Sequence, residues 1–426
     1  MKYALALTLA LGTAALAQNA RTVELRATIG NWLDPNSPTT DPTVRALMQR
    51  FQRENPNIKI SWDPQGYNEL EQKLLTSTAA SNPPDFAYVD SIWVQRLASL
   101  GALQPLDNLW SAKDRADYKP PFLAGAKYNG KLYAVWSETD TRVLWYNTEL
   151  FKKAGLDPNK PPRTWAEFMA DAKKLTGSGV YGVGIAFGPH EYLTADLFLT
   201  QFWGLGGKLI DAQGRPVFAQ GSNRAAAIKT LEFFGNLQKS KVIPPDALQL
   251  KGGDSLYAGM ASGRYAMVIG NNNAVEGGLK PIAPNTYQQW RAAVLPAPTG
   301  GKPSAMNGGF TWAIFTKDPA KQQAAWKFIS FWNSPAVQLE RYKPTAQVPV
   351  RFSTSKDKFY TSAFWQTVNK AVTAGQTRPG VAIYPVMSEQ IQQAIQSYLT
   401  GQKSAAQAID DAGKAVTAQY TRQQNR

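Results

Sequence analysis

Residues 128–168 read YNGKLYAVWSETDTRVLWYNTELFKKAGLDPNKPPRTWAEF, and this stretch decides the fold. Its opening Asn129-Gly130 predicts a turn, because both residue types accept positive φ angles. Leu132–Trp136 and Arg142–Tyr146 are rich in β-branched and aromatic residues, so we expect each run to form a strand. A short polar segment would separate the two strands.

That segment places Glu138, Asp140 and Arg142 beside the aromatic ring of Trp136. Such polar groups can hydrogen-bond hydroxyls while the ring covers an apolar face. The same residues would also fit a hairpin with solvated charges, and spacing alone does not separate the two interpretations.

Two helices are expected after these strands. The first covers Glu149–Ala154 and ends at Gly155, a residue type common just beyond helix ends. The proline-rich Pro158–Pro162 cannot continue a helix. Thr164 and Glu167 have the spacing of a capping box, which predicts the start of the second helix.

Four motifs in this order resemble the periplasmic solute-binding proteins of sugar-importing ABC transporters, the extracellular solute-binding family 1. They are Asn-Gly-Lys-x-Tyr from Asn129, Asp-Thr-Arg-x-x-x-Tyr-Asn from Asp140, LFKKAGLD from Leu150, and Pro-Pro-x-Thr-Trp-x-Glu-Phe from Pro161. The resemblance implies a two-lobed α/β fold of the type II-like periplasmic-binding-protein kind, with discontinuous lobes joined by three crossovers. It also implies an exported protein that captures a mono- or oligosaccharide and delivers it to the membrane permease of an ABC importer.

Length and composition agree with such a protein. A chain of 426 residues fits two domains of ordinary size. With 43% hydrophobic and 18% charged residues the chain is globular. No internal apolar run has the length that crosses a membrane.

The N-terminus has the pattern of a secretory signal peptide. Lys2 precedes the apolar run Ala4–Leu16, and Ala15-Leu16-Ala17 matches an A-x-A cleavage site. An ordinary first helix is the alternative. The chain has no cysteine, which excludes a disulfide, a thiolate metal site and a lipid anchor on a mature N-terminal cysteine. We therefore expect residues 1–17 to be removed and the mature protein to be unanchored in the periplasm.

The formal net charge is +15. No run of five or more Lys or Arg occurs, and the basic residues are interleaved with Asp and Glu. We expect no nucleic-acid partner and a monomer, with an anionic ligand or envelope surface as the alternative meaning of the charge.

The first hundred residues alternate strands and helices. Strands are expected at Val23–Gly30, Ile58–Trp62 and Phe86–Val89, each followed by a helix, which predicts a parallel sheet. Ligands bind beyond the carboxyl ends of such strands. The residues there are Trp32, Tyr67, Asp90 and Trp93, although each Trp also fits core packing.

The rest of the chain adds further candidates. Asn271 and Asn273 follow the expected strand Tyr265–Ile269, and amides suit hydroxyl ligands, although a capped turn is the alternative. Gly309 lies in a glycine pair that permits close backbone approach. The apolar helix near Phe198–Trp203 contributes one more aromatic residue. The resemblance adds further aromatic positions, and the full set of candidates is Trp32, Tyr67, Asp90, Trp93, Trp136, Asp140, Arg142, Trp203, Asn271, Asn273, Gly309, Trp312 and Tyr384.

Three links are expected between the lobes, near Lys119–Gly125, Pro296–Gly301 and Lys343–Pro349, with an extended crossover over Tyr342–Arg351. Three crossings predict a hinge motion. The expected division is residues 18–120 and 296–345 for lobe I, and 121–295 and 346–426 for lobe II and the C-terminal helices.

Enzyme chemistry is poorly supported. His190 is the sole histidine, and no G-x-S-x-G elbow, P-loop or dinucleotide fingerprint occurs. We expect no catalytic residue, metal or cofactor, and the remaining enzyme alternative is a glycosidase that uses Glu138 and Asp140. A second ligand alternative is glycerol 3-phosphate or another phosphorylated polyol held by Arg142 or Arg378, although Asp140 would repel a phosphate.

Overall fold

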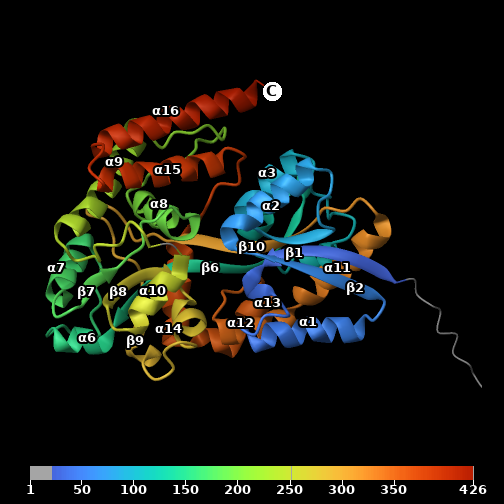
Figure 1. Ribbon diagram of the computed structural model, residues 1–426, viewed down its shortest axis with the longest axis horizontal. Coiled ribbons are helices and arrows are strands. Elements are labelled where there is room, and N and C mark those ends of the chain that lie inside the picture. The colour runs from blue at the N-terminus through green and yellow to red at the C-terminus, as the bar shows by residue number, and fades with distance from the viewer. Residues whose placement is uncertain (1–21, 251, 426) are drawn as a thin grey trace, which may run out of the picture.

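A computed structural model describes residues 22–250 and 252–425 as two lobes, with β6 and β10 running through the centre (Figure 1). The predicted signal peptide, residues 1–17, lies outside the described residues. None of the helices in the described ranges combines the length and apolarity of a membrane span.

The predicted strand–helix alternation opens the fold. The elements are β1 (Val23–Gly30), α1 (Pro42–Glu54), β2 (Ile58–Gln65), α2 (Tyr67–Ala79) and β3 (Phe86–Asp90). Strand β1 pairs in parallel with β2 and with β3. Asp41 caps α1 by accepting the Thr43 N–H at 2.8 Å, and Pro42 stands at its first position.

The strands form one mixed sheet in the order β2-β1-β3-β10-β6-β8-β7, with β11 beside β10 and β9 beside β6. The remaining strands of this sheet are β6 (Ala134–Asn147), β7 (Tyr181–Gly184), β8 (Tyr265–Asn271), β9 (Trp290–Ala293), β10 (Met306–Ile314) and β11 (Gln376–Thr377). The α/β fold class predicted from the sequence is confirmed.

Strand β6 corrects one prediction, because it is a single strand where two were expected. Its first part, Ala134–Thr141, pairs with β10, and its second part, Arg142–Asn147, pairs with β8 and β9. No Gly, Pro or Asn interrupts residues 136–142, and the backbone finds partners along the whole length. The chain therefore passes from one half of the sheet to the other within β6.

Two local predictions are confirmed around β6. Asn129 and Gly130 have φ angles of 46° and 79° and join β4 (Lys127–Tyr128) to β5 (Lys131–Leu132). Thr164 and Glu167 form the predicted capping box at the start of α7 (Trp165–Leu175).

Helices lie above and below the strands of the sheet in both lobes (Figure 1). In the first lobe α11 (Pro319–Trp332) packs on β1 and β10. In the second lobe α15 (Tyr384–Leu399) packs on α16 (Ala405–Gln424) and on α9 (Gly221–Lys239). The other α-helices are α3 (Val94–Ser99), α4 (Ala112–Arg115), α5 (Pro120–Gly125), α6 (Thr148–Lys153), α8 (Asp196–Gly204), α10 (Gly252–Ala261), α12 (Pro335–Thr345), α13 (Phe352–Ser355) and α14 (Ala363–Ala374).

The expected extended crossover at Tyr342–Arg351 is partly helical. Helix α12 begins at Pro335 and continues through Pro344 to Thr345. A proline one residue before the helix end costs little, since only the last turn loses a bond. Ala346 then takes a left-handed conformation, with φ 51°, and ends the helix.

Asn272 forms hydrogen bonds to two segments that pass between the lobes, β6 and the residues after α12. Its buried Oδ1 accepts the Thr141 N–H at 2.9 Å, and its own N–H donates to the Thr141 carbonyl at 3.0 Å. Its Nδ2 donates to the Ala346 carbonyl at 2.7 Å. One amide side chain therefore joins β6, the end of β8 and the segment after α12.

Replacing Asn272 with alanine should lower the free energy of unfolding by about 2–4 kcal/mol, because the Thr141 N–H and the Ala346 carbonyl lose their partners in a buried position. Chemical denaturation followed by circular dichroism measures this change. Asn273→Ala is the matched control, because that half-buried neighbour lies toward the cavity. Equal losses in the two variants would contradict the assignment of Asn272 as a structural tie.

Candidate functional site

A cavity of about 980 Å³ lies beyond the carboxyl ends of the β1, β3 and β8 strands. Its walls come from the segment after β1, the start of α2, the middle of β6 and the first residues of β10. The lining residues are Asn31, Trp32, Asp34, Ser37, Thr39, Pro64, Gly66, Tyr67, Asp90, Glu138, Thr139, Asp140, Arg142, His190, Gly252, Gly253, Tyr257, Asn271, Asn273, Gly308, Gly309, Phe310, Gln347 and Arg378. We call this cavity the cleft.

Eight of the candidates named from the sequence line the cleft. Topology brings them together, because β1 and β3 end at the cleft from one half of the sheet, β8 ends there from the other half in the opposite direction, and β6 passes between them. These residues are Trp32, Tyr67, Asp90, Asp140, Arg142, Asn271, Asn273 and Gly309.

The other five candidates lie elsewhere. Trp312 pairs in register with Tyr88, two residues inside the carboxyl end of β3, and is fully buried in the core. Trp136 packs on Phe122 with ring centroids 4.9 Å apart. Its ring also covers Gly309, where a Cβ would lie 2.6 Å from it. That glycine, with φ 147°, therefore makes room for a tryptophan.

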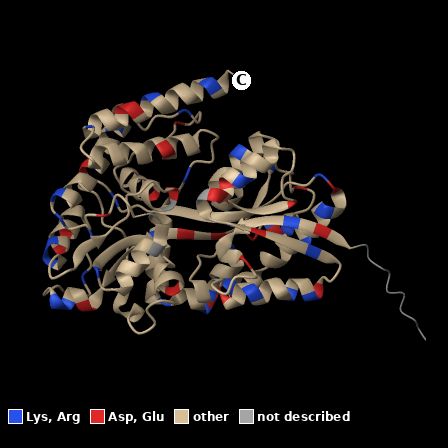
Figure 2. Ribbon diagram, viewed as in Figure 1, with Lys and Arg blue, Asp and Glu red and all other residues tan. Residues whose placement is uncertain are grey.

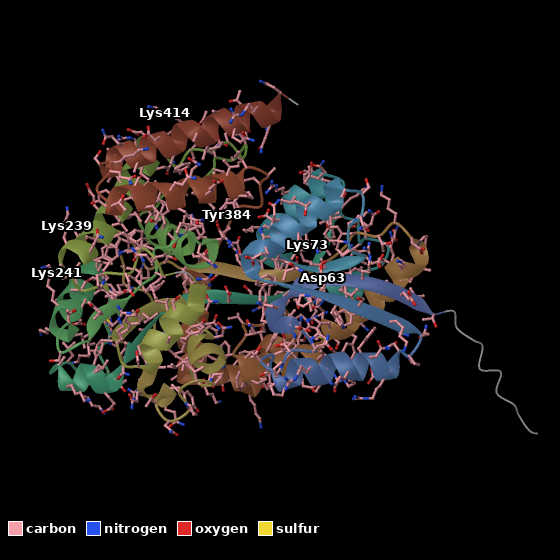
Figure 3. All side chains as sticks on the ribbon, viewed as in Figure 1. Asp63, Lys73, Lys239, Lys241, Tyr384 and Lys414 are labelled. Carbon is pink, nitrogen blue, oxygen red and sulfur yellow. The ribbon has the colours of Figure 1, made fainter. Side chains whose placement is uncertain are left out.

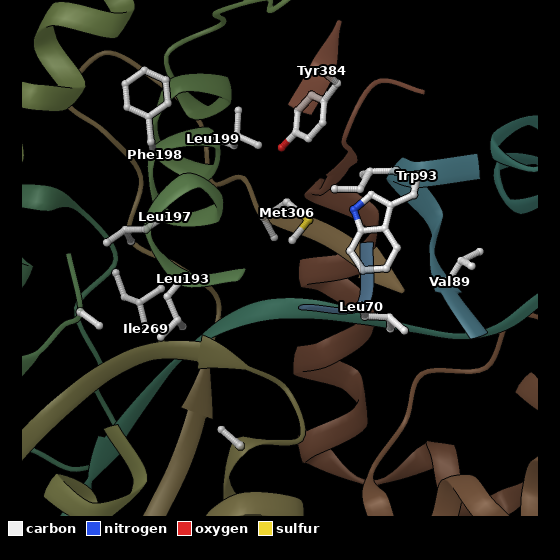
Figure 4. Packing of buried hydrophobic residues seen from close by; sticks show 14 of the residues in the cluster. Leu70, Val89, Trp93, Leu193, Leu197, Phe198, Leu199, Ile269, Met306 and Tyr384 are labelled. Carbon is white, nitrogen blue, oxygen red and sulfur yellow. The ribbon is translucent and has the colours of Figure 1, made fainter. Parts of the chain in front are cut away.

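Trp93, Trp203 and Tyr384 are also buried. Trp93 packs beside Tyr67 at 5.6 Å and borders a neighbouring cavity of about 210 Å³; Figure 4 shows it near Leu70. Trp203 lies in α8, which is buried along its whole length. Tyr384 stands at the start of α15 (Figure 3), and its hydroxyl donates to Glu191 at 2.6 Å.

Phe310 lines the cleft and was missed from the sequence. It pairs with Asp90 on β3 and Glu138 on β6, so it lies level with the carboxyl end of β3. Its ring stacks on Tyr88 at 5.0 Å and meets Trp32 edge-on at 5.2 Å. The choice between Phe310 and Trp312 depends on the register of β10 against β3, which the sequence alone does not give.

A buried charge network forms the inner wall of the cleft. Arg378 Nη2 donates to both carboxylate oxygens of Asp90, at 2.8 and 3.1 Å. Its Nη1 donates to Glu191 at 3.1 Å and lies 3.8 Å from Asp196. Tyr67 donates its hydroxyl to Asp90 at 2.8 Å.

Arg142 extends this network to β6. Its Nη1 donates to Asp140 at 2.8 Å, and its Nη2 donates to Asp196 on α8. Asp140 also accepts the Gly308 N–H at 3.1 Å and the Asn271 Nδ2 at 3.1 Å. The sequence analysis did not select Glu191 and Asp196. What could have indicated them is the presence of two carboxylates in a mainly apolar stretch of the sequence, residues 191–199.

Burial shifts the pKa of three groups in this network. It raises the pKa of Asp196 to about 7, although Arg142 and Arg378 oppose the shift. Burial also raises the pKa of Asp90, again against the attraction of Arg378. The hydroxyl pKa of Tyr67 is raised well above its usual range, first by burial and then by the charge of Asp90.

Glu138 has a separate partner. Arg341 Nη1 donates to it at 2.5 Å, and Arg341 Nη2 donates to the Ser137 carbonyl at 2.9 Å. Ser137 is the extra residue of a bulge in β6, since Trp136 and Glu138 face Thr311 and Phe310. The two carboxylates of the glycosidase alternative, Glu138 and Asp140, are thus both held by arginines. Within the described ranges no group of three or more metal-ligating side chains is placed to hold an ion.

The high pKa of Asp196 predicts a pH dependence of stability. Between pH 4 and 7 the folded protein keeps a proton on Asp196 that the unfolded chain releases, so this group's contribution to stability falls as pH rises through that range. Relative to Asp196→Asn, the wild-type protein should lose about 1–3 kcal/mol of stability between pH 5 and pH 8. Urea denaturation of both proteins at the two pH values measures the difference.

Asp357→Asn provides the control. The Phe359 N–H is the largest contributor that lowers the pKa of Asp357, so this group stays ionised from pH 5 to pH 8. Its difference from wild type should therefore be the same at both pH values. A pH-independent difference for Asp196→Asn would contradict the assigned protonation.

Comparison with known proteins identifies the fold family. The family model described as bacterial extracellular solute-binding protein matches residues 35–339. The sn-glycerol-3-phosphate-binding periplasmic protein UgpB of Escherichia coli K12 is 26% identical over 401 residues, which cover 87% of each chain.

Solved structures of solute-binding proteins have the same fold as this chain. An ABC transporter solute-binding protein from Thermotoga lettingae, bound with α-D-tagatose, superposes with a TM-score of 0.83 at 27% identity, over 93% of this chain and 99% of that one. Maltose-bound MalE3 of T. maritima shares the fold, with a TM-score of 0.81 at 24% identity over 93% and 99% of the two chains. The resemblance inferred from the four motifs is confirmed, and the chain belongs to the bacterial extracellular solute-binding protein family.

Proposed function

We propose that this protein captures a carbohydrate in the cleft and delivers it to the permease of an ABC importer. The Thermotoga lettingae relative, which carries a bound monosaccharide, supports a sugar ligand. We further propose that the protein works in the periplasm, as the family description and the periplasmic UgpB relative suggest. We also propose that it works as a monomer.

The observation that carries this proposal is that the arginines of the cleft are already paired with carboxylates of the protein, so the described lining residues do not offer a free cation to an anionic ligand. Both arginines of the lining, Arg142 and Arg378, are already held by carboxylates. The rings of Trp32 and Phe310 line the same cavity as the acceptors Asp140 and Asn271. Rings cover the apolar faces of a sugar, and acceptors bind its hydroxyls.

A phosphorylated polyol is the second candidate, favoured by the similarity to UgpB. Its phosphate would need an arginine released from the network. Releasing Arg378 leaves Asp90 and Glu191 without their cation, a costly change in a buried site. We therefore rank it below an unphosphorylated sugar.

The proposed lobes differ slightly from the sequence-based division. We assign residues 22 to about 141 to the first lobe, because Ala134–Thr141 pairs with β10. The second lobe then begins at Arg142, and the chain returns to the first lobe between β9 and β10. Closure of the lobes over the ligand would be the state that the importer recognises.

The ligand class can be tested with a thermal-shift screen. A ligand present at 100 times its dissociation constant should add about 2.7 kcal/mol to the stability of the folded protein. We expect at least one mono- or oligosaccharide to raise the Tm, and sn-glycerol 3-phosphate to leave it unchanged. A rise with the phosphate alone would overturn the carbohydrate assignment.

Trp32→Ala should weaken binding of the sugar found in that screen by roughly tenfold or more, because the ring would cover an apolar sugar face. Isothermal titration calorimetry measures the change. Tyr287→Ala is the matched control, since this half-buried ring lies on the second lobe under Lys280, away from the cleft lining. Equal affinities for Trp32→Ala and Tyr287→Ala would remove Trp32 from the site.

A further inference from the structure

The charge of the cleft is opposite to that of the protein. Figure 2 shows acidic residues along the central strands, while many basic residues lie on outer helices. The chain as a whole carries +15. Among the described residues, the cleft lining holds four carboxylates, Asp34, Asp90, Glu138 and Asp140, and two arginines.

The residues that pair with this lining keep the excess negative. Glu191 and Asp196 add two carboxylates and Arg341 adds one guanidinium. Six carboxylates therefore face three arginines, and protonation of Asp196 still leaves five against three. Asp34 forms no ion pair within the described part of the chain.

The arginines of this group donate inward, to the protein. Arg341 donates to Glu138 and Ser137, and Arg378 to Asp90 and Glu191. Arg142 donates to Asp140 and Asp196. The Nη groups of these arginines are therefore occupied by acceptors of the protein itself.

Asn271 supplies an independent sign of a missing donor. Its side chain lines the cleft and is 6% exposed. Its Nδ2 donates to Asp140, which fixes the amide orientation and leaves Oδ1 without a hydrogen-bond partner. A buried acceptor without a partner is costly, and a donor from the ligand would satisfy it.

The aromatic residues of the cleft suit the same chemistry. The ring of Phe310 meets the rings of Trp32 and Tyr67 edge-on at the cavity. A cation over such ring faces is attracted by their negative electrostatic potential. Carboxylates, an unpartnered amide oxygen and aromatic faces thus lie around one cavity.

We infer that the ligand is a carbohydrate that carries a protonated amine, an amino sugar or an oligosaccharide of amino sugars. An ammonium group offers three donors and one positive charge and accepts no hydrogen bond. A hydroxyl offers a single donor and also needs one. This inference rests on the proposed function and narrows its ligand class.

Matched saccharides test the inference directly. Isothermal titration of the full mature protein compares glucosamine with N-acetylglucosamine and glucose, and chitosan oligosaccharides with their N-acetylated counterparts. We expect the amine-bearing member of at least one matched set to bind at least tenfold more tightly. Its affinity should fall as the salt concentration rises, because salt screens the attraction between exposed charges.

Charge-removing variants locate the effect. Asp34→Asn removes an unpaired carboxylate from the lining and should reduce the preference for the amine several-fold. Glu24→Gln removes an exposed carboxylate near the opposite end of β1 and should leave the preference unchanged. Equal effects of the two variants would mean that total charge, and not the cleft, sets the preference, and would overturn the inference.

The possible failures are distinguishable. Neutral sugars that bind as tightly as their amine counterparts would overturn this inference and leave the proposed function intact. Binding of sn-glycerol 3-phosphate without any saccharide would overturn both. If none of the amine-bearing saccharides binds, the inference is also overturned.

Discussion

Strand β6 is shared by the two halves of the sheet. The rest of the structure depends on how the backbone N–H and C=O groups at the midpoint of β6 find hydrogen-bond partners. Up to Thr141 its backbone pairs with β10, and from Arg142 onward it pairs with β8 and β9. At the change of partner, Asn272 holds the Thr141 backbone from both sides. Asp140 and Arg142 flank this point, so the residues at the junction of the lobes also face the cleft.

Local features of the sequence predicted the elements with short-range causes. The Asn129-Gly130 turn, the Asp41 cap and the capping box at Thr164 all depend on neighbours within four residues, and all are present. The continuity of β6 depends on partners more than 120 residues away, β8 and β10, so no local pattern could reveal it. Helix α12 was missed because Pro344 indicates a helix break, although near the helix end it is tolerated.

The cleft was predictable to the extent that topology determines it. Residues just after β1 and β3 line the cleft, as expected for parallel strands that end together. Residues at the end of β8 meet them from the opposite direction, because β8 runs antiparallel to β1 and β3. The tryptophans were less predictable, because a large ring fits a core and a binding site equally well. Trp312 and Phe310 differ by two residues along one strand, and only the pairing with Asp90 and Tyr88 decides which lies at the edge.

The network around Arg378 joins the two lobes at the cleft through charged contacts. Arg378 holds Asp90 at the end of β3 and Glu191 after β7 at once. Burying such charges costs free energy, so the network contributes little net stability. When the lobes separate, water can replace each of these partners, whereas an apolar interface would lose about 25 cal/mol for every Å² exposed. A charged contact therefore holds the lobes in this arrangement at little net free energy, which suits the hinge motion expected from the three crossings.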